Sequence, residues 1–109
     1  MSAPPIPLDQ LQASAVQAAA LLKALSNPTR LLLLCQIGQG EYCVGELETL
    51  TGIRQPTLSQ QLTILRAEAL VSTRREGKQI FYRIASTQAL AVMQVLIEQF
   101  CQSENGTTP

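Results

Sequence analysis

The sequence predicts a mainly α-helical domain that carries one small β-hairpin. Apolar residues recur at three- and four-residue intervals in several segments, which is typical of amphipathic helices. Two short segments in the C-terminal half alternate between apolar and polar residues around a glycine, which indicates a hairpin. The chain has 109 residues, the length of a single domain. We therefore expect an α+β fold with four helices, two strands and a last helix, in the order ααααββα.

The N-terminal part is expected to contain two helices separated by a break at proline. Residues 1–7 hold three prolines and no apolar pattern, so we expect a flexible arm there. Residues 8–25 are rich in Ala, Leu and Gln and carry one apolar stripe, which suits helix packing. Asn27 is placed to cap the next helix, and Pro28 suits its first position. That helix, residues 28–37, is apolar almost all round and is expected to be the buried centre.

Two further helices, at residues 44–50 and 56–69, are joined by a short turn that contains Gly52. The second of them places leucines on one side and polar residues on the other. This order is a helix-turn-helix, in which the N-terminal residues of the second helix meet DNA base edges. Gln can pair with adenine through two hydrogen bonds, and Ser or Thr can bond a base. The candidate base-reading residues are Gln55, Thr57, Ser59, Gln60 and Gln61.

The hairpin is expected at residues 71–75 and 79–84, with Gly77 at its tip. Six basic and two acidic residues lie between positions 54 and 83, a net charge of +4 in a chain whose total is zero. This asymmetry concentrates positive potential on one face, where phosphates can bind. A basic hairpin directly after a helix-turn-helix makes a winged helix-turn-helix. The candidate basic DNA contacts are Arg66, Arg74, Arg75 and Lys78.

The C-terminal segment predicts a last helix and a polar tail. Ser86 is placed to cap a helix that runs to about residue 102 and has an apolar side. Residues 103–109 are polar and expected to be disordered. Residues 8–102 are therefore taken as one domain for DNA binding and dimerisation. A domain of this size is only modestly stable alone, so burying more surface in a dimer is a common solution.

Several other classes of function are disfavoured. No apolar run approaches the roughly 20 residues of a membrane span, and no signal-peptide pattern is present, so we expect a cytoplasmic protein with no membrane partner. The chain has no histidine and no clustered carboxylates, so its Ser and Cys residues lack an obvious base. We therefore expect neither an enzyme nor a cofactor. A protein-interaction module with an incidental basic hairpin is the alternative from a different class.

Four motifs between residues 21 and 84 carry a family resemblance: LLKALSNPTRLLLL, VGELE, QPTLSQQLTILR and LVSTRREGKQIFYRI. They resemble the ArsR/SmtB winged-helix repressors, and the likeness covers about four-fifths of the chain once both end helices are included. It implies a homodimer through the first and last helices, bound to double-stranded operator DNA with an inverted repeat. Within the family the chain is most similar to the BigR/SqrR branch, whose repressors sense persulfides through two cysteines, and HlyU is similar to the same branch.

The resemblance also implies a role for cysteines. Metal sites in the family commonly need imidazole, which this chain lacks. Of the family's Cys-Val-Cys arsenic-type site, the sequence keeps only the first thiol, at Cys43. The sensing cysteines of the BigR/SqrR branch lie in the second and last helices, at the positions of Cys35 and Cys101. The resemblance thus implies a repressor that releases DNA when reactive sulfur species or oxidants link Cys35 and Cys101.

The residues alone leave other interpretations of the cysteines open. Cys35 and Cys101 also fit apolar positions, where free Cys behaves as a small hydrophobe. Cys43 sits where a helix cap would normally be Ser or Thr, and it can be incidental. The alternative function is a metalloid-responsive repressor, of the arsenite type, that uses all three thiolates as ligands.

Overall fold

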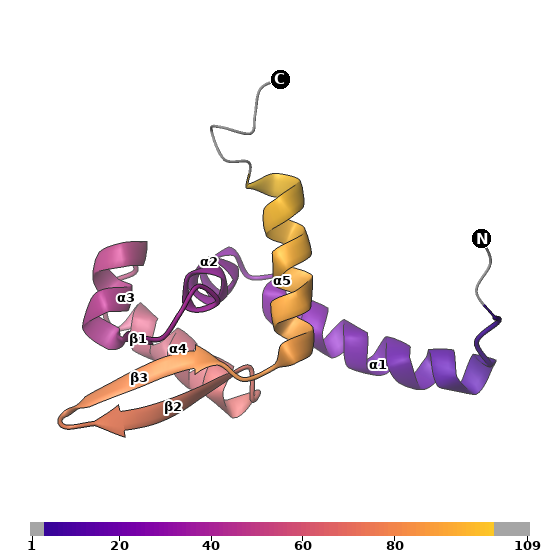
Figure 1. Cartoon of the computed structure of the whole chain (residues 1–109), viewed down its shortest axis with the longest axis horizontal. Coiled ribbons are helices and arrows are strands. Elements are labelled where there is room, and N and C mark those ends of the chain that lie inside the picture. The colour runs from indigo at the N-terminus through magenta and orange to yellow at the C-terminus, as the bar shows by residue number, and fades with distance from the viewer. Residues whose placement is uncertain (1–3, 102–109) are drawn as a thin grey trace, which may run out of the picture.

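A computed structural model of the protein describes residues 4–101 as five helices and a three-stranded antiparallel sheet (Figure 1). It confirms the predicted fold class, a winged helix-turn-helix, and adds one short strand to the predicted order. The elements are α1 (Leu8–Leu25), α2 (Pro28–Ile37), β1 (Tyr42–Cys43), α3 (Val44–Thr51), α4 (Thr57–Ala67), β2 (Val71–Glu76), β3 (Gln79–Ile84) and α5 (Thr87–Phe100).

Helix α2 lies at the centre of the domain, as the sequence predicted. Leu33, Leu34 and Ile37 have no exposed surface, and α2 packs against α1, α3, α4, α5 and β3. The burial is incomplete on one side, since Leu32 is 49% exposed. The neighbouring elements cover the faces that carry the other leucines, and none of the described elements covers the face of Leu32.

Side chains cap two helices at the predicted positions. Asn27 accepts a hydrogen bond from the backbone N–H of Arg30 at 3.0 Å, at the start of α2. Ser86 accepts one from the backbone N–H of Ala89 at 3.0 Å, at the start of α5. Both caps satisfy a donor that has no partner inside its own helix.

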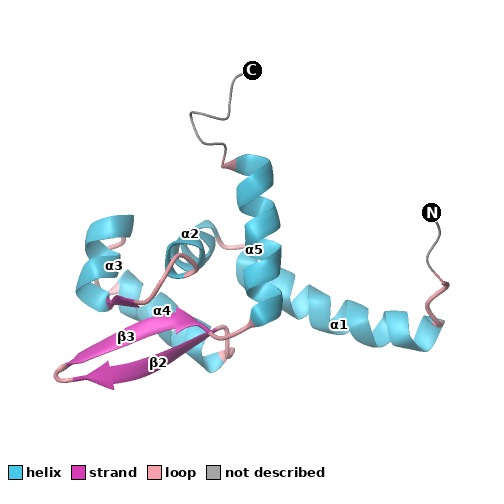
Figure 2. Cartoon of the chain, in the orientation of Figure 1, coloured by secondary structure: helices cyan, strands magenta, loops and turns pink. Residues whose placement is uncertain are grey.

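Strand β3 lies in the middle of the sheet, between β1 and β2 (Figure 2). The β2–β3 hairpin is antiparallel, with Val71 opposite Ile84. Gly77 turns the chain between these strands at φ 64°, a left-handed conformation that glycine adopts without strain. Sequence analysis missed β1, because a strand of two residues is too short to show an alternating pattern.

Helix α4 ends at Ala67, two residues before the predicted end. The backbone N–H of Leu70 bonds the Leu65 carbonyl at 3.0 Å, and that of Ala69 bonds Arg66 at 3.0 Å. This pair of bonds is a Schellman motif, whose left-handed position is usually glycine. Here it is Ala69, at φ 60°, so the sequence lacked the glycine that normally marks such an end.

Helix α1 projects away from the rest of the chain (Figure 1). It is buried only at its C-terminal end, whereas Leu8 and Val16 are 69% and 72% exposed. The radius of gyration is 16.3 Å, against roughly 13 Å for a compact domain of this length. Most of α1 therefore lacks a packing partner within the described part of the chain.

The predicted boundaries at the ends are only partly covered by the structure. Residues 4–7 form no regular element, and α5 ends at Phe100 where the sequence predicted about residue 102. The tail predicted for residues 103–109 and the first part of the predicted arm, residues 1–3, lie outside the described residues. Among helices of the described residues, none is both long and apolar enough to cross a membrane.

The left-handed Ala69 gives a test of the α4 end. The change Ala69→Gly is expected to raise the free energy of unfolding by about 1 kcal/mol, because it removes the clash of a Cβ in this conformation. The same change at Ala67, the last helical residue of α4, is expected to lower it, by up to about 1 kcal/mol. Urea unfolding at one fixed protein concentration measures both; two changes of the same sign would contradict the assignment.

Candidate nucleic-acid interface and thiol pair

Helix α4 presents a polar face to solvent beside the hairpin. Its leucines are fully or almost fully buried against the core, which fixes the orientation of the helix. Thr57, Ser59 and Gln60, which sequence analysis assigned to base reading, are exposed on its first turns. These side chains are the ones a DNA groove could reach without any rearrangement of the core.

The other two candidate base readers are engaged within the protein. The side-chain oxygen of Gln55 accepts the backbone N–H of Ser59 at 3.1 Å, so Gln55 caps the start of α4. The side-chain oxygen of Gln61 accepts a long hydrogen bond from Arg30 Nη1 at 3.5 Å. Sequence analysis missed Arg30. A usable signal existed, because a cation next to the apolar run of α2 needs partners for its guanidinium.

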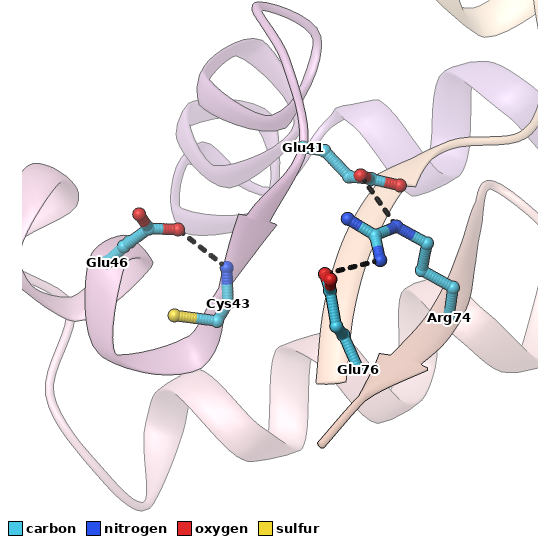
Figure 3. Close-up of polar contacts among 5 residues, drawn as sticks. All are labelled: Glu41, Cys43, Glu46, Arg74 and Glu76. Carbon is cyan, nitrogen blue, oxygen red and sulfur yellow. Dashed lines mark hydrogen bonds and ion pairs between the residues drawn. The ribbon is translucent and has the colours of Figure 1, made fainter. Parts of the chain in front are cut away.

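Arg74, in the middle of β2, is held by two carboxylates (Figure 3). Its Nε donates to Glu41 and its Nη1 donates to Glu76, each at 2.8 Å. The guanidinium also lies 4.8 Å from the ring centre of Phe81. The hydrogen bonds to Glu76 and Glu41 raise the pKa of Arg74. The negative charges of Glu41 and Glu76 thus offset the positive charge of Arg74, one of the wing residues predicted to contact DNA.

The other basic candidates are exposed and lie on different surfaces. Arg75 follows Arg74 in β2, so its side chain leaves the opposite face of the hairpin. Its Nε donates to the Gly77 carbonyl at 3.2 Å, which holds the side chain toward the tip of the wing. Lys78 is exposed at that tip, and Arg66 is exposed near the end of α4.

Cys35 lies in α2, and Cys101 directly follows the last residue of α5. These are the second and last helices, to which the family resemblance assigned them. Cys35 is half-buried, whereas Cys101 is exposed and donates its N–H to the Ile97 carbonyl at 2.8 Å. Burial raises the pKa of the Cys35 thiol, and the charge of Cys101 raises it further. A thiolate opposes a second ionisation in this way only when the two groups are near each other. Helix α2 packs against α5, so the two thiols lie on neighbouring elements, and both are unlinked.

Cys43 is the N-cap residue of α3 (Figure 3). Its backbone N–H donates to the Glu46 carboxylate at 3.0 Å, as in a capping box. Within residues 4–101, which include all three cysteines, no group of three His, Cys, Asp or Glu side chains could hold a metal ion. A three-thiolate site would need a different arrangement of these side chains.

Comparison with known proteins places this geometry in a family. Residues 27–73 match the profile of the bacterial regulatory protein, arsR family. The chain is 52% identical over 101 residues to the biofilm growth-associated repressor of Agrobacterium fabrum, which covers 93% of this chain and 86% of that protein. The chain belongs to the ArsR family.

Two solved structures share the fold over most of the chain. The repressor BigR from Xylella fastidiosa superposes with a TM-score of 0.82 and 46% identity, over 90% of this chain and all of BigR. Reduced HlyU from Vibrio cholerae gives 0.80 and 38%, over 85% of this chain and 98% of HlyU. The ArsR profile spans α2, α3, α4 and the start of β2, whereas the likeness to BigR extends over most of the chain. The family resemblance stated from sequence motifs is confirmed, and the family is one of regulatory proteins, not enzymes.

The pKa of Cys35 gives a test of the thiol pair. In a Cys43→Ser protein, alkylation of Cys35 is expected to rise with pH through a range above the ordinary thiol value of about 8.5. Adding Cys101→Ser removes the neighbouring charge, so the pKa of Cys35 should fall, although burial keeps it raised. Mass spectrometry of iodoacetamide-treated protein between about pH 6 and pH 10 measures the profile. An identical profile with and without Cys101 would mean that the thiols do not interact.

Proposed function

We propose that the chain is a homodimeric transcriptional repressor that binds operator DNA and releases it when reactive sulfur species or oxidants link Cys35 to Cys101. The observation that carries this proposal is an ArsR-family fold in which α2, which bears Cys35, packs against α5, which Cys101 directly follows, and both thiols are free. The similar Agrobacterium protein is named a repressor, and the similar solved structure from Xylella is a transcriptional repressor too. The Vibrio HlyU sequence, named a transcriptional activator, is less similar, at 37% identity.

A second copy of the chain is the partner that best explains α1. Its exposed apolar residues, together with Val95 and Phe100 on α5, would leave a large apolar surface in water. Packing α1 and α5 against the same helices of a second copy buries that surface in a two-fold interface. A two-fold dimer carries two copies of α4, which suits an operator built as an inverted repeat.

The charge pattern supports a division of labour on DNA. Thr57, Ser59 and Gln60 would enter the major groove on α4 and contact base edges. Arg75 and Lys78, whose charges point to solvent from the wing, would bind the phosphate backbone. Arg66 adds a further positive charge near the end of α4. Arg74 is expected to contribute less, since Glu41 and Glu76 already offset its charge. In this proposal the polar residues of α4 contact the bases, and the basic residues contact the phosphate backbone.

The proposed switch is a sulfur exchange between a persulfide and the two protein thiols. The exposed Cys101 thiolate attacks the outer sulfur of a persulfide such as glutathione persulfide, breaks its S–S bond and releases glutathione. The Cys35 thiolate then attacks the Cys101 sulfur, forms a Cys35–Cys101 disulfide and releases sulfide. Both protein thiols are oxidised, and the transferred sulfur is reduced. Each further persulfide molecule transfers one more sulfur atom to the Cys101 persulfide and releases glutathione; the Cys35 thiolate then closes a trisulfide or tetrasulfide, and sulfide again leaves.

The bridge would act on DNA through the placement of α5 relative to α2. Helix α2 packs against α4, and α5 belongs to the proposed dimer interface. A covalent link between them biases the spacing of the two α4 helices across the dimer, so that both cannot enter successive grooves. The inducer thus needs no binding site of its own on the DNA-facing surface.

The wing assignment predicts a change in salt dependence. The double change Arg75→Ala, Lys78→Ala should weaken binding to DNA from upstream of the protein's own gene. It should also lower the slope of log affinity against log salt by about 1.8, or about 0.9 per lost phosphate contact. Arg74→Ala is the matched control and should alter the slope much less. Fluorescence anisotropy at several salt concentrations measures this, and an unchanged slope in the double variant would contradict the wing contacts.

The thiol proposal predicts a specific crosslink. Treatment of the reduced protein with glutathione persulfide should produce a di-, tri- or tetrasulfide between Cys35 and Cys101 within one chain, detected by mass spectrometry. Cys43→Ser should form the same crosslink, whereas Cys35→Ser and Cys101→Ser should not. If no such crosslink forms in the wild-type protein, the sensing part of the proposal is lost while DNA binding can stand.

A further inference from the structure

The side chain of Arg30 joins three helices at one point. It extends from α2 and donates from Nε to the Ala24 carbonyl at 2.9 Å and from Nη2 to the Lys23 carbonyl at 3.5 Å, both in the last turn of α1. Its Nη1 donates to the side-chain oxygen of Gln61 on α4 at 3.5 Å. The carbonyls at the end of a helix lack intrahelical partners and carry partial negative charge, so they hold a guanidinium in place. Arg30 is therefore anchored at α1 and turned toward α4.

The contact with Arg30 fixes how the Gln61 amide is turned. Arginine can only donate hydrogen bonds, so the group of Gln61 that faces it must be the carbonyl oxygen. An amide nitrogen at that place would set two donors against each other. The amide nitrogen of Gln61 is consequently directed away from Arg30. With its oxygen engaged, Gln61 is poorly suited to the two-bond recognition of adenine that its residue type suggested.

The position of Gln61 on α4 places this donor at the edge of the recognition surface. Gln61 lies three residues after Leu58 and four before Leu65, both fully buried, so it emerges beside the buried side of the helix. It is partly buried, whereas Gln60 is exposed. With α4 in the major groove, as proposed above, a side chain at such an edge would face the wall of the groove, where phosphate oxygens are the available acceptors.

We propose that Arg30 is a positioning residue for DNA binding: it holds the Gln61 carbonyl so that the Gln61 amide nitrogen donates to a DNA phosphate. This inference rests on the proposed DNA-binding function. It assigns Arg30 no direct contact with DNA, and it changes the role of Gln61 from a base reader to a backbone clamp. The same guanidinium ties that clamp to the end of α1, so a shift of α1 alters the aim of the Gln61 amide.

The test is a double-mutant cycle on the full-length dimer. Gln61→Ala and Arg30→Ala should each weaken DNA binding by about tenfold to a hundredfold, the loss expected for one hydrogen bond to a charged phosphate. In the Gln61→Ala background, Arg30→Ala should have no further effect on binding, because the positioned group is already gone. In a Ser59→Ala background, which is the matched control, Arg30→Ala should keep its full effect. Binding is measured by anisotropy on upstream DNA and on a random duplex of equal length, and both should lose affinity by the same factor.

Two further readouts separate positioning from the alternatives. A purely structural role of Arg30 would lower the unfolding free energy and weaken DNA binding equally in both backgrounds. A direct phosphate contact by Arg30 would lower the salt slope by about 0.9 in Arg30→Ala, whereas positioning leaves the slope unchanged. Arg30→Lys keeps the charge but not the planar fork, so it should bind DNA like Arg30→Ala.

Each contrary result has a distinct meaning. Additive losses in the cycle, a lowered salt slope in Arg30→Ala, or full affinity in Gln61→Ala would overturn the inference and leave the repressor proposal standing. A loss confined to the upstream duplex would make Gln61 a base reader and overturn the clamp. If the wild-type protein binds neither duplex at low salt, the proposed function and this inference fail together.

Discussion

The packing of α2 in the centre of the domain is the constraint on which the rest of the structure depends. Leu33, Leu34 and Ile37 are buried without exposed surface, and the helix contacts α1, α3, α4, α5 and β3. Its burial also fixes what projects from its two ends. Arg30 leaves the first turn toward α1 and α4, and Cys35 leaves the third turn within range of the Cys101 charge. One buried helix thus places both groups on which the proposals for DNA binding and for sulfur sensing rest.

The features that sequence analysis predicted are those encoded over short stretches of chain. Asn27 and Pro28 mark the start of α2 because capping and the fixed φ of proline are local effects. Gly77 marks the hairpin tip for the same reason. The end of α4 was placed too late because the left-handed residue that follows the helix is Ala69. Glycine usually occupies that position and marks the helix end in a sequence.

The features that escaped prediction depend on contacts between distant parts of the chain. Arg74 was expected on phosphates, but its nearest partners include Glu41, which lies 33 residues earlier. Gln61 was expected on bases, but it meets Arg30 across 31 residues. A residue type shows what a side chain can bond, and only the packed fold shows which of those bonds are already made. Thr57 and Lys78, by contrast, are exposed, as the DNA contacts suggested by the sequence require.

Two features of the molecule are separate: a basic wing beside the polar face of α4, and a pair of thiols, one on α2 and one directly after α5. We propose that the state of the thiol pair controls how the wing and α4 bind DNA. Binding to the upstream duplex, measured by anisotropy before and after glutathione persulfide, tests it most directly. Wild-type affinity should fall by at least about tenfold, within the usual range of coupling between sites, and return on reduction with dithiothreitol, whereas Cys35→Ser should bind equally well in both conditions. Full affinity in a wild-type sample shown to be crosslinked between Cys35 and Cys101 would contradict the claim.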